Sequence, residues 1–242
     1  MTVSVGTSGW QYRDWRAAFY PRDVPTRSWL GYYAQHFPVV EVNNTFYRLP
    51  EATTFEQWAA ATPPDFGFVV KASRYLTHIR RLRDPEEPVD RLLTRARSLG
   101  SKLRGVLLQL PPTLERDVAS LERVLAVFGT GTRVALEPRH PSWFDTHTYD
   151  VLRQFDAALC LTDREGPASP LVRTAGWCYL RLHEGRARPR PCYGRTALGH
   201  WVQRLDDLYG RDPAGFVFFN NDECACAPRN ALTLTKMWAS RR

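Results

Sequence analysis

The run Val39-Val40-Glu41-Val42-Asn43 is short, apolar and rich in β-branched residues, and it is the clearest predicted strand in the chain. Such a run predicts a buried strand rather than a helix. A segment with helical spacing of its apolar residues, Thr54–Ala61, follows it. Together they predict one strand–helix unit, in which the two-residue period of the strand places Glu41 and Asn43 on the same face.

The same strand–helix succession recurs along the whole chain. The predicted strands are Val3–Thr7, Val39–Asn43, Phe66–Lys71, Gly105–Leu110, Arg133–Glu137, Ala157–Asp163, Trp177–His183 and Phe216–Asn221. The predicted helices are Trp29–Phe37, Thr54–Ala61, Val89–Leu99, Leu114–Phe128, His147–Phe155, Ala197–Tyr209 and Asn230–Trp238. Alternation of this kind predicts a parallel sheet. Eight strands about thirty residues apart favour an α/β fold with a single (β/α)₈, TIM-barrel-like domain over residues 1–242, against the alternative of a doubly wound open sheet.

Length and composition are typical of a globular protein. The chain has 242 residues, 43% of them hydrophobic and 24% charged, so it can form a large core. No stretch approaches twenty consecutive apolar residues, and we expect no contact with a membrane. The first residues lack the pattern of a signal peptide, which predicts a cytoplasmic protein.

The net charge of the chain does not decide which kind of partner it binds. Lys and Arg number 33 against 25 Asp and Glu, a net charge of +8. A basic balance favours phosphate-bearing partners, among them DNA or RNA. A surface that simply prefers arginine accounts for it equally well. The oligomeric state stays open.

Polar residues follow seven of the eight predicted strands at their carboxyl ends. They are Glu41 and Asn43, Lys71, Gln109, Glu137 and Arg139, Asp163, Arg181 and His183, and Asn220 and Asn221. In a TIM barrel these positions meet at the face where barrel enzymes build their active sites. We therefore favour a polar pocket, with a charge-paired network that only seals the barrel as the alternative.

Twelve segments carry a resemblance to a known family. They are Gly6–Trp10, Phe19–Pro21, Tyr32–Ala34, Val40–Tyr47, Lys71-Ala72, Thr77-His78, Lys102-Leu103, Gln109–Pro112, Glu137–His140, Arg181–His183, Phe219–Asn221 and Asn230-Ala231. In this order the chain resembles the DUF72, or YecE-like, family. The resemblance implies a TIM-barrel-like fold, likened to sugar-isomerase and apurinic-endonuclease barrels, without an established reaction. Two positions depart from the family pattern: Glu184 precedes Gly185, and Arg195-Thr196 lacks the usual tyrosine.

The candidate pocket balances acids and bases. The candidate catalytic residues are Glu41, Lys71, Glu137, Asp163 and His183. The candidate substrate-binding residues are Trp10, Asn43, Tyr47, Gln109, Arg139, Arg181, Asn220 and Asn221. A divalent-metal site normally has an excess of carboxylate and imidazole, so we expect no metal cluster and no cofactor. One ion on Glu137, Asp163 and His183 remains an alternative.

This balance favours acid–base chemistry on an anionic or polyhydroxylated small molecule. Glu41 or Glu137 would be the general base, with His183 as acid, and Lys71 would orient an oxyanion or form a Schiff base. Arg139 and Arg181 would bind a phosphate or carboxylate. A glycosidase pair made by Glu41 and Glu137 stays open. The sequence thus favours a metal-independent hydrolase, lyase or isomerase; the alternative is a nucleic-acid-binding protein, repair-nuclease-like in function.

Aromatic and cysteine residues give weaker signals. Aromatic residues near the predicted strand ends suit stacking of a sugar or a base, or a packed layer of loops: Trp10, Tyr12, Trp15, Phe46, Tyr47, Tyr75 and Trp143. Cys160 and Cys178 lie in apolar runs and predict buried, inert thiols. The Cys224-Ala225-Cys226 stretch predicts a reactive or merely tolerated thiol pair, because its spacing does not suit zinc.

Overall fold

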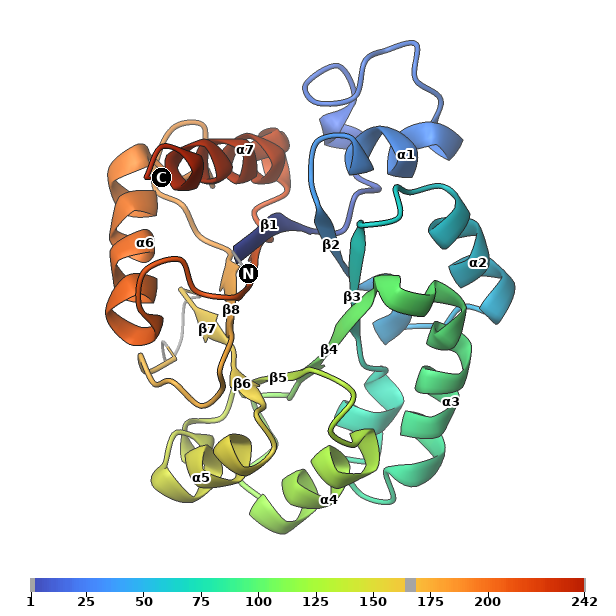
Figure 1. Ribbon diagram of the computed structural model, residues 1–242, viewed down its shortest axis with the longest axis vertical. Coiled ribbons are helices and arrows are strands. Elements are labelled where there is room, and N and C mark those ends of the chain that lie inside the picture. Colours follow the sequence, from blue (N-terminus) through green and yellow to red (C-terminus); the bar gives the residue numbers. More distant parts are fainter. Residues whose placement is uncertain (1–2, 164–168, 242) are drawn as a thin grey trace.

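A sheet of parallel strands, nearly closed into a barrel, with helices around it forms the fold (Figure 1). The computed structural model describes residues 3–163 and 169–241. The strands are β1 (Val3–Ser8), β2 (Val39–Val42), β3 (Gly67–Lys71), β4 (Leu103–Gln109), β5 (Val134–Glu137), β6 (Ala158–Leu159), β7 (Leu161–Thr162), β8 (Cys178–Leu182) and β9 (Gly215–Phe219). Their order in the sheet is β6-β5-β4-β3-β2-β1-β9-β8-β7, and every strand pairing is parallel. The predicted (β/α)₈ barrel is confirmed.

The sixth predicted strand is split in two at Cys160. β6 pairs only with β5, and β7 pairs only with β8. The backbone N–H of Cys160 donates to the carbonyl of Leu136 in β5, at 2.8 Å. Before Cys160 the chain pairs with β5, and after it the chain pairs with β8. The nine strands therefore correspond to the eight that the sequence predicts, and this break is where the two ends of the sheet meet along the chain.

Each predicted helix is present, with shifted ends. The helices are α1 (Trp29–Ala34), α2 (Ala52–Ala60), α3 (Glu86–Ala96), α4 (Val118–Phe128), α5 (Thr146–Gln154), α6 (Arg195–Tyr209) and α7 (Cys226–Ala239). α4 begins four residues later than expected because the Asp117 carboxylate accepts the backbone N–H of Ser120, at 3.0 Å, and caps it. α7 begins four residues earlier than the pattern predicts, directly after Ala225.

Two cores result from the alternation of side chains along the strands. The barrel interior holds Val39, Val69, Leu107, Ala135, Ala158, Cys160, Ala175, Trp177, Tyr179, Phe216 and Phe218. The opposite faces of the strands pack against the helices in a larger core. Because both faces are buried, the strands are almost continuously apolar. The polar residues at their carboxyl ends are the exception.

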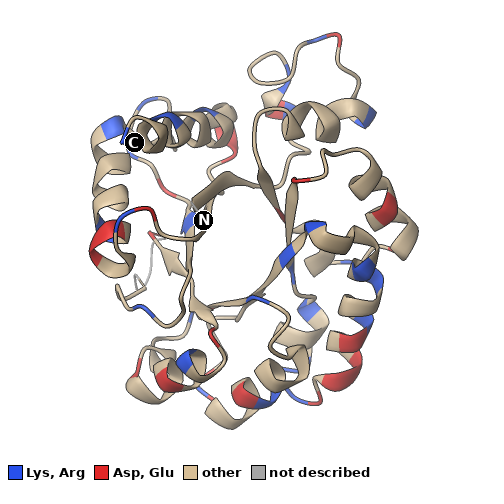
Figure 2. Ribbon diagram, in the orientation of Figure 1, with Lys and Arg blue, Asp and Glu red and all other residues tan. Residues whose placement is uncertain are grey.

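Charged residues of both signs are interspersed on the outer helices (Figure 2). Several pair locally, as do Arg91 with Glu87 within α3 and Arg123 with Glu86 between α4 and α3. Within residues 3–163 and 169–241, none of the helices has the length and apolar character needed to cross a membrane.

One cysteine expectation was wrong. Cys226 is not a free thiol beside Cys224: it forms a disulfide with Cys192, and Cys224 is free and exposed. The spacing between neighbouring cysteines could not reveal this partner, because Cys192 lies in the loop before α6. Cys160 and Cys178 are free and buried, as predicted.

Candidate functional site

A buried polar network lies at the carboxyl ends of β2, β3, β4, β5 and β8. Its members are Glu41, Lys71, Gln109, Glu137 and Arg181, each at most 9% exposed. All five are predicted site residues. They continue the inward-facing positions of their strands, so the two-residue period carries them into the mouth of the barrel.

One side of the network joins three neighbouring strands. The Lys71 ammonium donates to Oε1 of Gln109 at 2.7 Å, and the Gln109 amide donates to Oε1 of Glu137 at 2.7 Å. Gln109 and Glu137 are register partners in β4 and β5, which fixes this contact. Gln109 therefore bridges the two charged groups and fixes where the Lys71 ammonium lies relative to the Glu137 carboxylate.

The other side of the network crosses the barrel. Arg181 donates from Nη1 to Glu137 and from Nη2 to Oε1 of Glu41, the latter at 2.9 Å. The Tyr179 hydroxyl donates to the second oxygen of Glu41 at 2.5 Å. One guanidinium thus pairs with two carboxylates, and with the Lys71 ammonium the four charges sum to zero. Because unpaired ions are costly to bury, this balance is what allows so many charges in the interior.

The pKa values of Glu137 and Lys71 differ in what they allow at neutral pH. Burial opposes ionisation of Glu137, yet the positive charges of Arg181, His183 and Arg139 outweigh it and lower the pKa of this carboxyl to about 2. Burial and the charge of Arg181 lower the pKa of Lys71 to about 8. Glu137 is therefore a fixed anion at neutral pH, whereas Lys71 can exchange a proton there.

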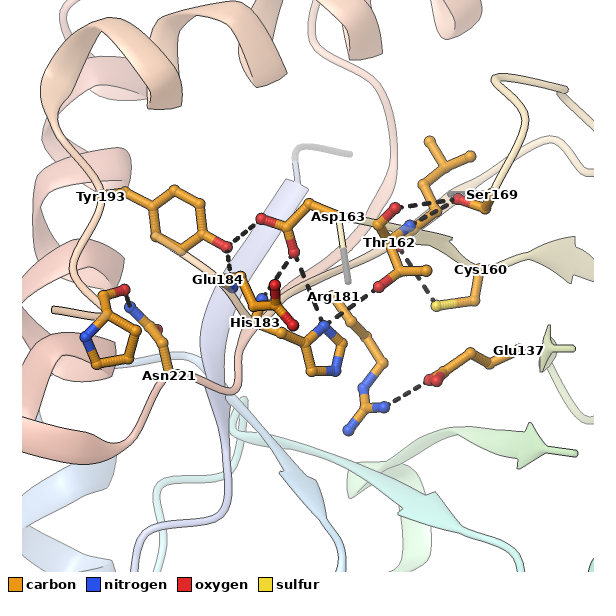
Figure 3. A network of polar contacts seen from close by, with 12 residues as sticks. Glu137, Cys160, Thr162, Asp163, Ser169, Arg181, His183, Glu184, Tyr193 and Asn221 are labelled. Atoms are coloured by element: carbon orange, nitrogen blue, oxygen red, sulfur yellow. Dashed lines mark hydrogen bonds and ion pairs between the residues drawn. The ribbon is translucent and has the colours of Figure 1, made fainter. Parts of the chain in front are cut away.

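A second cluster, formed by Asp163, His183 and Tyr193, lies beside the network (Figure 3). Asp163 accepts the backbone N–H of His183 at 2.8 Å and the Tyr193 hydroxyl, and its Oδ1 lies 3.8 Å from Nδ1 of the imidazole. Nδ1 also contacts Oγ1 of Thr162 at 3.2 Å. Burial opposes ionisation of Asp163, but its bonds to His183 and Tyr193 prevail and lower its pKa. The imidazole is held through Nδ1, which leaves Nε2 for another partner.

Two buried nitrogen atoms of the site have no partner within the described part of the chain. They are Nε of Arg181 and Nε2 of His183. Buried polar groups in proteins are almost always hydrogen-bonded. Unpartnered atoms of this kind are typical of a site that bonds to a bound molecule or to water.

Three further predicted site residues, Arg139, Tyr47 and Asn220, differ in their contacts. Arg139 is partly exposed, and its Nε lies 3.4 Å from Oε1 of Glu137. Tyr47 is 83% exposed and its ring packs edge-on against Phe46. Asn220 bonds through its backbone N–H to the carbonyl of Leu182.

Asn221 does not join the network. Its amide donates to the carbonyl of Pro191 at 2.9 Å and to the side chain of Asn230 at 3.0 Å. Asn230 in turn bonds the backbone N–H and the carbonyl of Tyr193, each at 2.9 Å. These bonds tie Asn221 to the loop before α6. Its side-chain oxygen is buried without a partner among the described residues.

Trp10 and Asn43 lie together at a small hollow between the loops that follow β1 and β2. Its volume is about 180 Å³, and Gly9, Gln11, Tyr12, Val42 and Asn44 complete its lining. The side-chain oxygen of Asn43 is buried there without a partner among the described residues. Burial and the negative charges of Asp222 and Glu41 raise the pKa of Tyr12, which places the hollow close to the charged network.

Sequence reasoning missed three groups of the site. His78 packs edge-on against Phe46, whose ring also lies 4.3 Å from the Lys71 ammonium. Burial and the charges of Lys71 and Arg139 lower the pKa of His78 to about 4. Burial raises the pKa of Asp222 to about 7. His78 lies in a short π-helix, Tyr75–Ile79, and Tyr193 lies in a loop, so no strand period could indicate them. Asp222 directly follows the predicted pair Asn220-Asn221 and could have been included.

The donor set does not favour a metal centre. Glu137 already accepts bonds from Gln109 and Arg181. Across residues 3–163 and 169–241, no three His, Cys, Asp or Glu side chains group in a way that could hold a metal ion. The alternative of one ion on Glu137, Asp163 and His183 therefore has no support from this geometry.

The fold and its polar mouth define a TIM-barrel-like protein, and its sequence assigns it to a family. Residues 4–242 match the model of DUF72, described as a protein of unknown function, and the chain belongs to this family. It is 27% identical to the UPF0759 protein YunF of Bacillus subtilis, over 97% of this chain and 94% of that protein. It is 34% identical to YecE of Escherichia coli over 48% of this chain and 43% of YecE.

Solved structures agree with the family and the fold. A DUF72 family protein from Thermotoga maritima superimposes with a TM-score of 0.86 at 29% identity, over 99% of this chain and 100% of that chain. D-allulose 3-epimerase from Methylomonas sp., solved in complex with D-allulose, gives a TM-score of 0.59 at 13% identity over 100% and 98% of the two chains. The second likeness concerns the fold alone.

Proposed function

We propose that this protein is an enzyme that carries out metal-independent acid–base chemistry on a small phosphorylated or sugar-like molecule at the mouth of its barrel. Hydrolysis, elimination and isomerisation all fit this chemistry. The observation that carries the proposal is the pair of buried, unpartnered nitrogens, Nε of Arg181 and Nε2 of His183, beside a lysine with a pKa of about 8. Both nitrogens are donors or acceptors that a substrate or a water molecule would satisfy.

The anionic part of the substrate would lie against the cations of the mouth. Lys71, Arg139 and Arg181 are grouped around Glu137. Burial and the positive charge of Lys71 and Arg139 together depress the pKa of His78 nearby. A phosphate or carboxylate bound there would gain charge-assisted hydrogen bonds. Glu137 would hold Arg181 in place rather than take a proton, because it is too weak a base at a pKa of about 2. Glu41 would hold the same guanidinium through its bond to Nη2.

Proton transfer would fall to Lys71 and His183. A group transfers protons best when its pKa lies near the working pH, and Lys71 meets this condition. His183 would act through Nε2, since its Nδ1 is held by Thr162 and lies near Asp163. Asp163 and Tyr193 would orient the imidazole.

The uncharged part of the substrate would occupy the hollow lined by Trp10 and Asn43. Its volume of about 180 Å³ is below the range of drug-sized sites, so a single small ring would fill it. An aromatic wall with amide groups suits a polyhydroxylated ring. The fold likeness to an epimerase solved with a sugar is consistent with this class and adds no residue roles.

A ligand panel tests the proposal. Wild type and Lys71→Met would be screened against monosaccharides, sugar phosphates and inorganic phosphate by thermal shift, and then for turnover of any ligand found. We expect a phosphorylated sugar to raise the Tm of the wild type and not of Lys71→Met. Lys236→Met makes the same change at an exposed lysine and should bind as the wild type does.

The opposing outcome is equally specific. If Lys71→Met and Glu137→Gln both lower the Tm while no compound in the panel binds to the wild type, the network is a structural seal and the proposal is wrong. The prediction of nucleic-acid binding gains no support from the site geometry or from the comparisons.

A further inference from the structure

A second hollow lies at the amino-terminal end of the barrel, opposite the mouth that holds the network. Its volume is about 310 Å³, and its lining includes Ser4, Gly67, Arg104, Arg133 and Phe216, from the beginnings of five strands. Gly67 and Lys71 are the two ends of β3, about 13 Å apart at the rise of a parallel strand. The hollow is therefore separate from the network.

Two glycines at inward-facing positions leave this space open. Val69 of β3 and Leu107 of β4 lie in the core of the barrel interior. Gly67 and Gly105 come two residues earlier on the same strands, so the two-residue period places them on the same face. A TIM barrel normally fills its interior with layers of bulky side chains. Without side chains at these two positions, the lowest layer stays incomplete.

A bulge in β4 turns Arg104 towards the hollow. The register between β3 and β4 shifts by one residue after Phe68, so Arg104 is an extra residue between two paired ones. Bulges at the rims of barrels change the direction of a side chain in this way. A Cβ atom on Gly67 would lie only 2.6 Å from Cγ of Arg104, so the arginine uses the space that the glycine leaves. Its Nη2 donates to the carbonyl of Asp65 at 3.2 Å.

Arg133 reaches the same hollow from the start of β5. Its guanidinium lies over the ring of Trp177, 5.5 Å from the ring centroid. Trp177 is buried, and its indole N–H donates to the carbonyl of Asp156 at 3.0 Å, so the ring is a fixed platform. Stacking of this kind orients a guanidinium and leaves its N–H groups free to bond.

The two guanidiniums keep their charge available. Among the ion pairs of residues 3–163 and 169–241, none joins Arg104 or Arg133 to a carboxylate. The lining of the hollow holds these two positive charges against the single negative charge of Asp65. An anion that enters the hollow therefore meets an excess of positive charge.

We propose that this hollow is a second binding site, which takes a small molecule with a single ring and a phosphate group. The phosphate would lie between Arg104 and Arg133, where two guanidiniums can bond several of its oxygens. The ring would lie against Val39 and Phe216, which are both buried in the barrel interior and line the hollow. A volume of about 310 Å³ is at the lower limit of small-molecule sites, which suits one ring.

The hollow is assigned binding and no chemistry. Barrel enzymes build their active sites at the carboxyl ends of the strands, and this hollow lies at the other ends. Its lining holds no group paired for proton transfer. The inference does not rest on the function proposed for the mouth.

Isothermal titration calorimetry with phenyl phosphate at low ionic strength tests the site. We expect phenyl phosphate to bind to the wild type, and about tenfold more weakly to Arg104→Met and to Arg133→Met, because each variant loses a charge-assisted contact. Arg204→Met is the matched control: Arg204 is exposed and lies over the ring of Trp201 at 4.7 Å, and its loss should leave binding unchanged. Phenol, the same ring without the phosphate, should not bind measurably.

Lys71→Met separates this site from the mouth. Phenyl phosphate should bind to Lys71→Met as tightly as to the wild type. If Lys71→Met loses binding while both arginine variants keep it, the phosphate lies in the mouth, which overturns this inference and supports the proposed function. Absence of binding to the wild type at millimolar phenyl phosphate would also overturn the inference, and it would leave the proposal for the mouth to its own ligand panel.

Gly67→Ala tests the geometry without removing a charge. The added methyl group would meet Cγ of Arg104 and push this side chain out of the hollow. We expect phenyl phosphate to bind severalfold more weakly to Gly67→Ala, in a protein that still unfolds cooperatively on heating. Wild-type affinity in folded Gly67→Ala would contradict the part assigned to Arg104.

Discussion

Arg181 and Glu41 lie 140 residues apart in the chain, and their side chains meet at 2.9 Å across the barrel. The same guanidinium holds Glu137, so one residue of β8 pairs with the ends of β2 and β5. Loss of one partner from a buried ion pair leaves an uncompensated charge, which costs far more than the pair itself contributes. Arg181 is thus central to the stability of the mouth and, in the proposed function, to its chemistry.

Replacement of Arg181 by Met should strongly destabilise the fold. Two buried carboxylates lose their partner, and we expect the free energy of unfolding to fall by about 3–5 kcal/mol in urea titrations. Arg123→Met, which removes an exposed partner of Glu86, is the matched control and should change stability little. Equal losses in the two variants would contradict the central role of Arg181.

Acid should destabilise the protein through Glu137. Its folded pKa of about 2 lies below the ordinary value of 4.5, so the folded state favours the carboxylate. The stability that this provides is present above about pH 4.5 and is lost as the pH falls towards 2. Measured by urea titration at each pH, Glu137→Gln should lack this part of the acid dependence. An unchanged profile between pH 4.5 and 2 would show that Glu137 does not supply it.

Lys71 should titrate near pH 8. Burial lowers its pKa from 10.5, so the unfolded state binds more protons between pH 8 and 10.5 and stability should rise with pH across that window. Only three lysines occur in the chain, and NMR of protein labelled at lysine can follow each one. We expect one midpoint near 8, absent in Lys71→Met. Midpoints above 10 for all three would exclude the shift.

Asp222 should oppose stability at alkaline pH. Its folded pKa of about 7 lies above the ordinary 3.8, so stability is present below about pH 4 and falls as the pH rises through 7. Asp222→Asn keeps the shape and removes the charge. We expect it to raise the Tm at pH 8 and to change it little at pH 4. A lower Tm at pH 8 would mean that the buried carboxylate is needed in its ionised form.

Close packing of β1 against β2 should make Gly6 intolerant of a side chain. A Cβ atom there would lie 2.1 Å from the carbonyl oxygen of Val39, which belongs to the paired strand. Gly6→Ala should therefore force the strands apart and cost about 1–3 kcal/mol in chemical denaturation. At Gly131 nothing lies within 4 Å of a Cβ, so Gly131→Ala serves as the control. Similar losses in both variants would argue against a steric cause.

The sequence predicts the fold and the central network because both depend on strand periodicity. Glu41, Lys71, Gln109, Glu137 and Arg181 end buried strands, and parallel strands of a barrel bring such ends together. The family resemblance points to the same fold. The helix ends were less accurate, since caps such as Asp117 decide them.

Residues that reach the mouth from loops could not be predicted in this way. Tyr193 contacts Asp163 from a loop 30 residues further along the chain, and no period connects the two. Asn221 was chosen for its strand end, yet its side chain turns to the loop before α6. The partner of Cys226 depends likewise on how a loop folds back over α7.

All five members of the buried network belong to strands of one sheet, whereas the hollow beside it is lined by loop residues apart from Val42 at the end of β2. Hydrogen-bonded strands hold side chains more rigidly than loops do. In the proposed function, reactivity and selectivity would thus be carried by separate parts of the molecule. Loop grafting between relatives should therefore change the shape and lining of the hollow and leave the buried network intact.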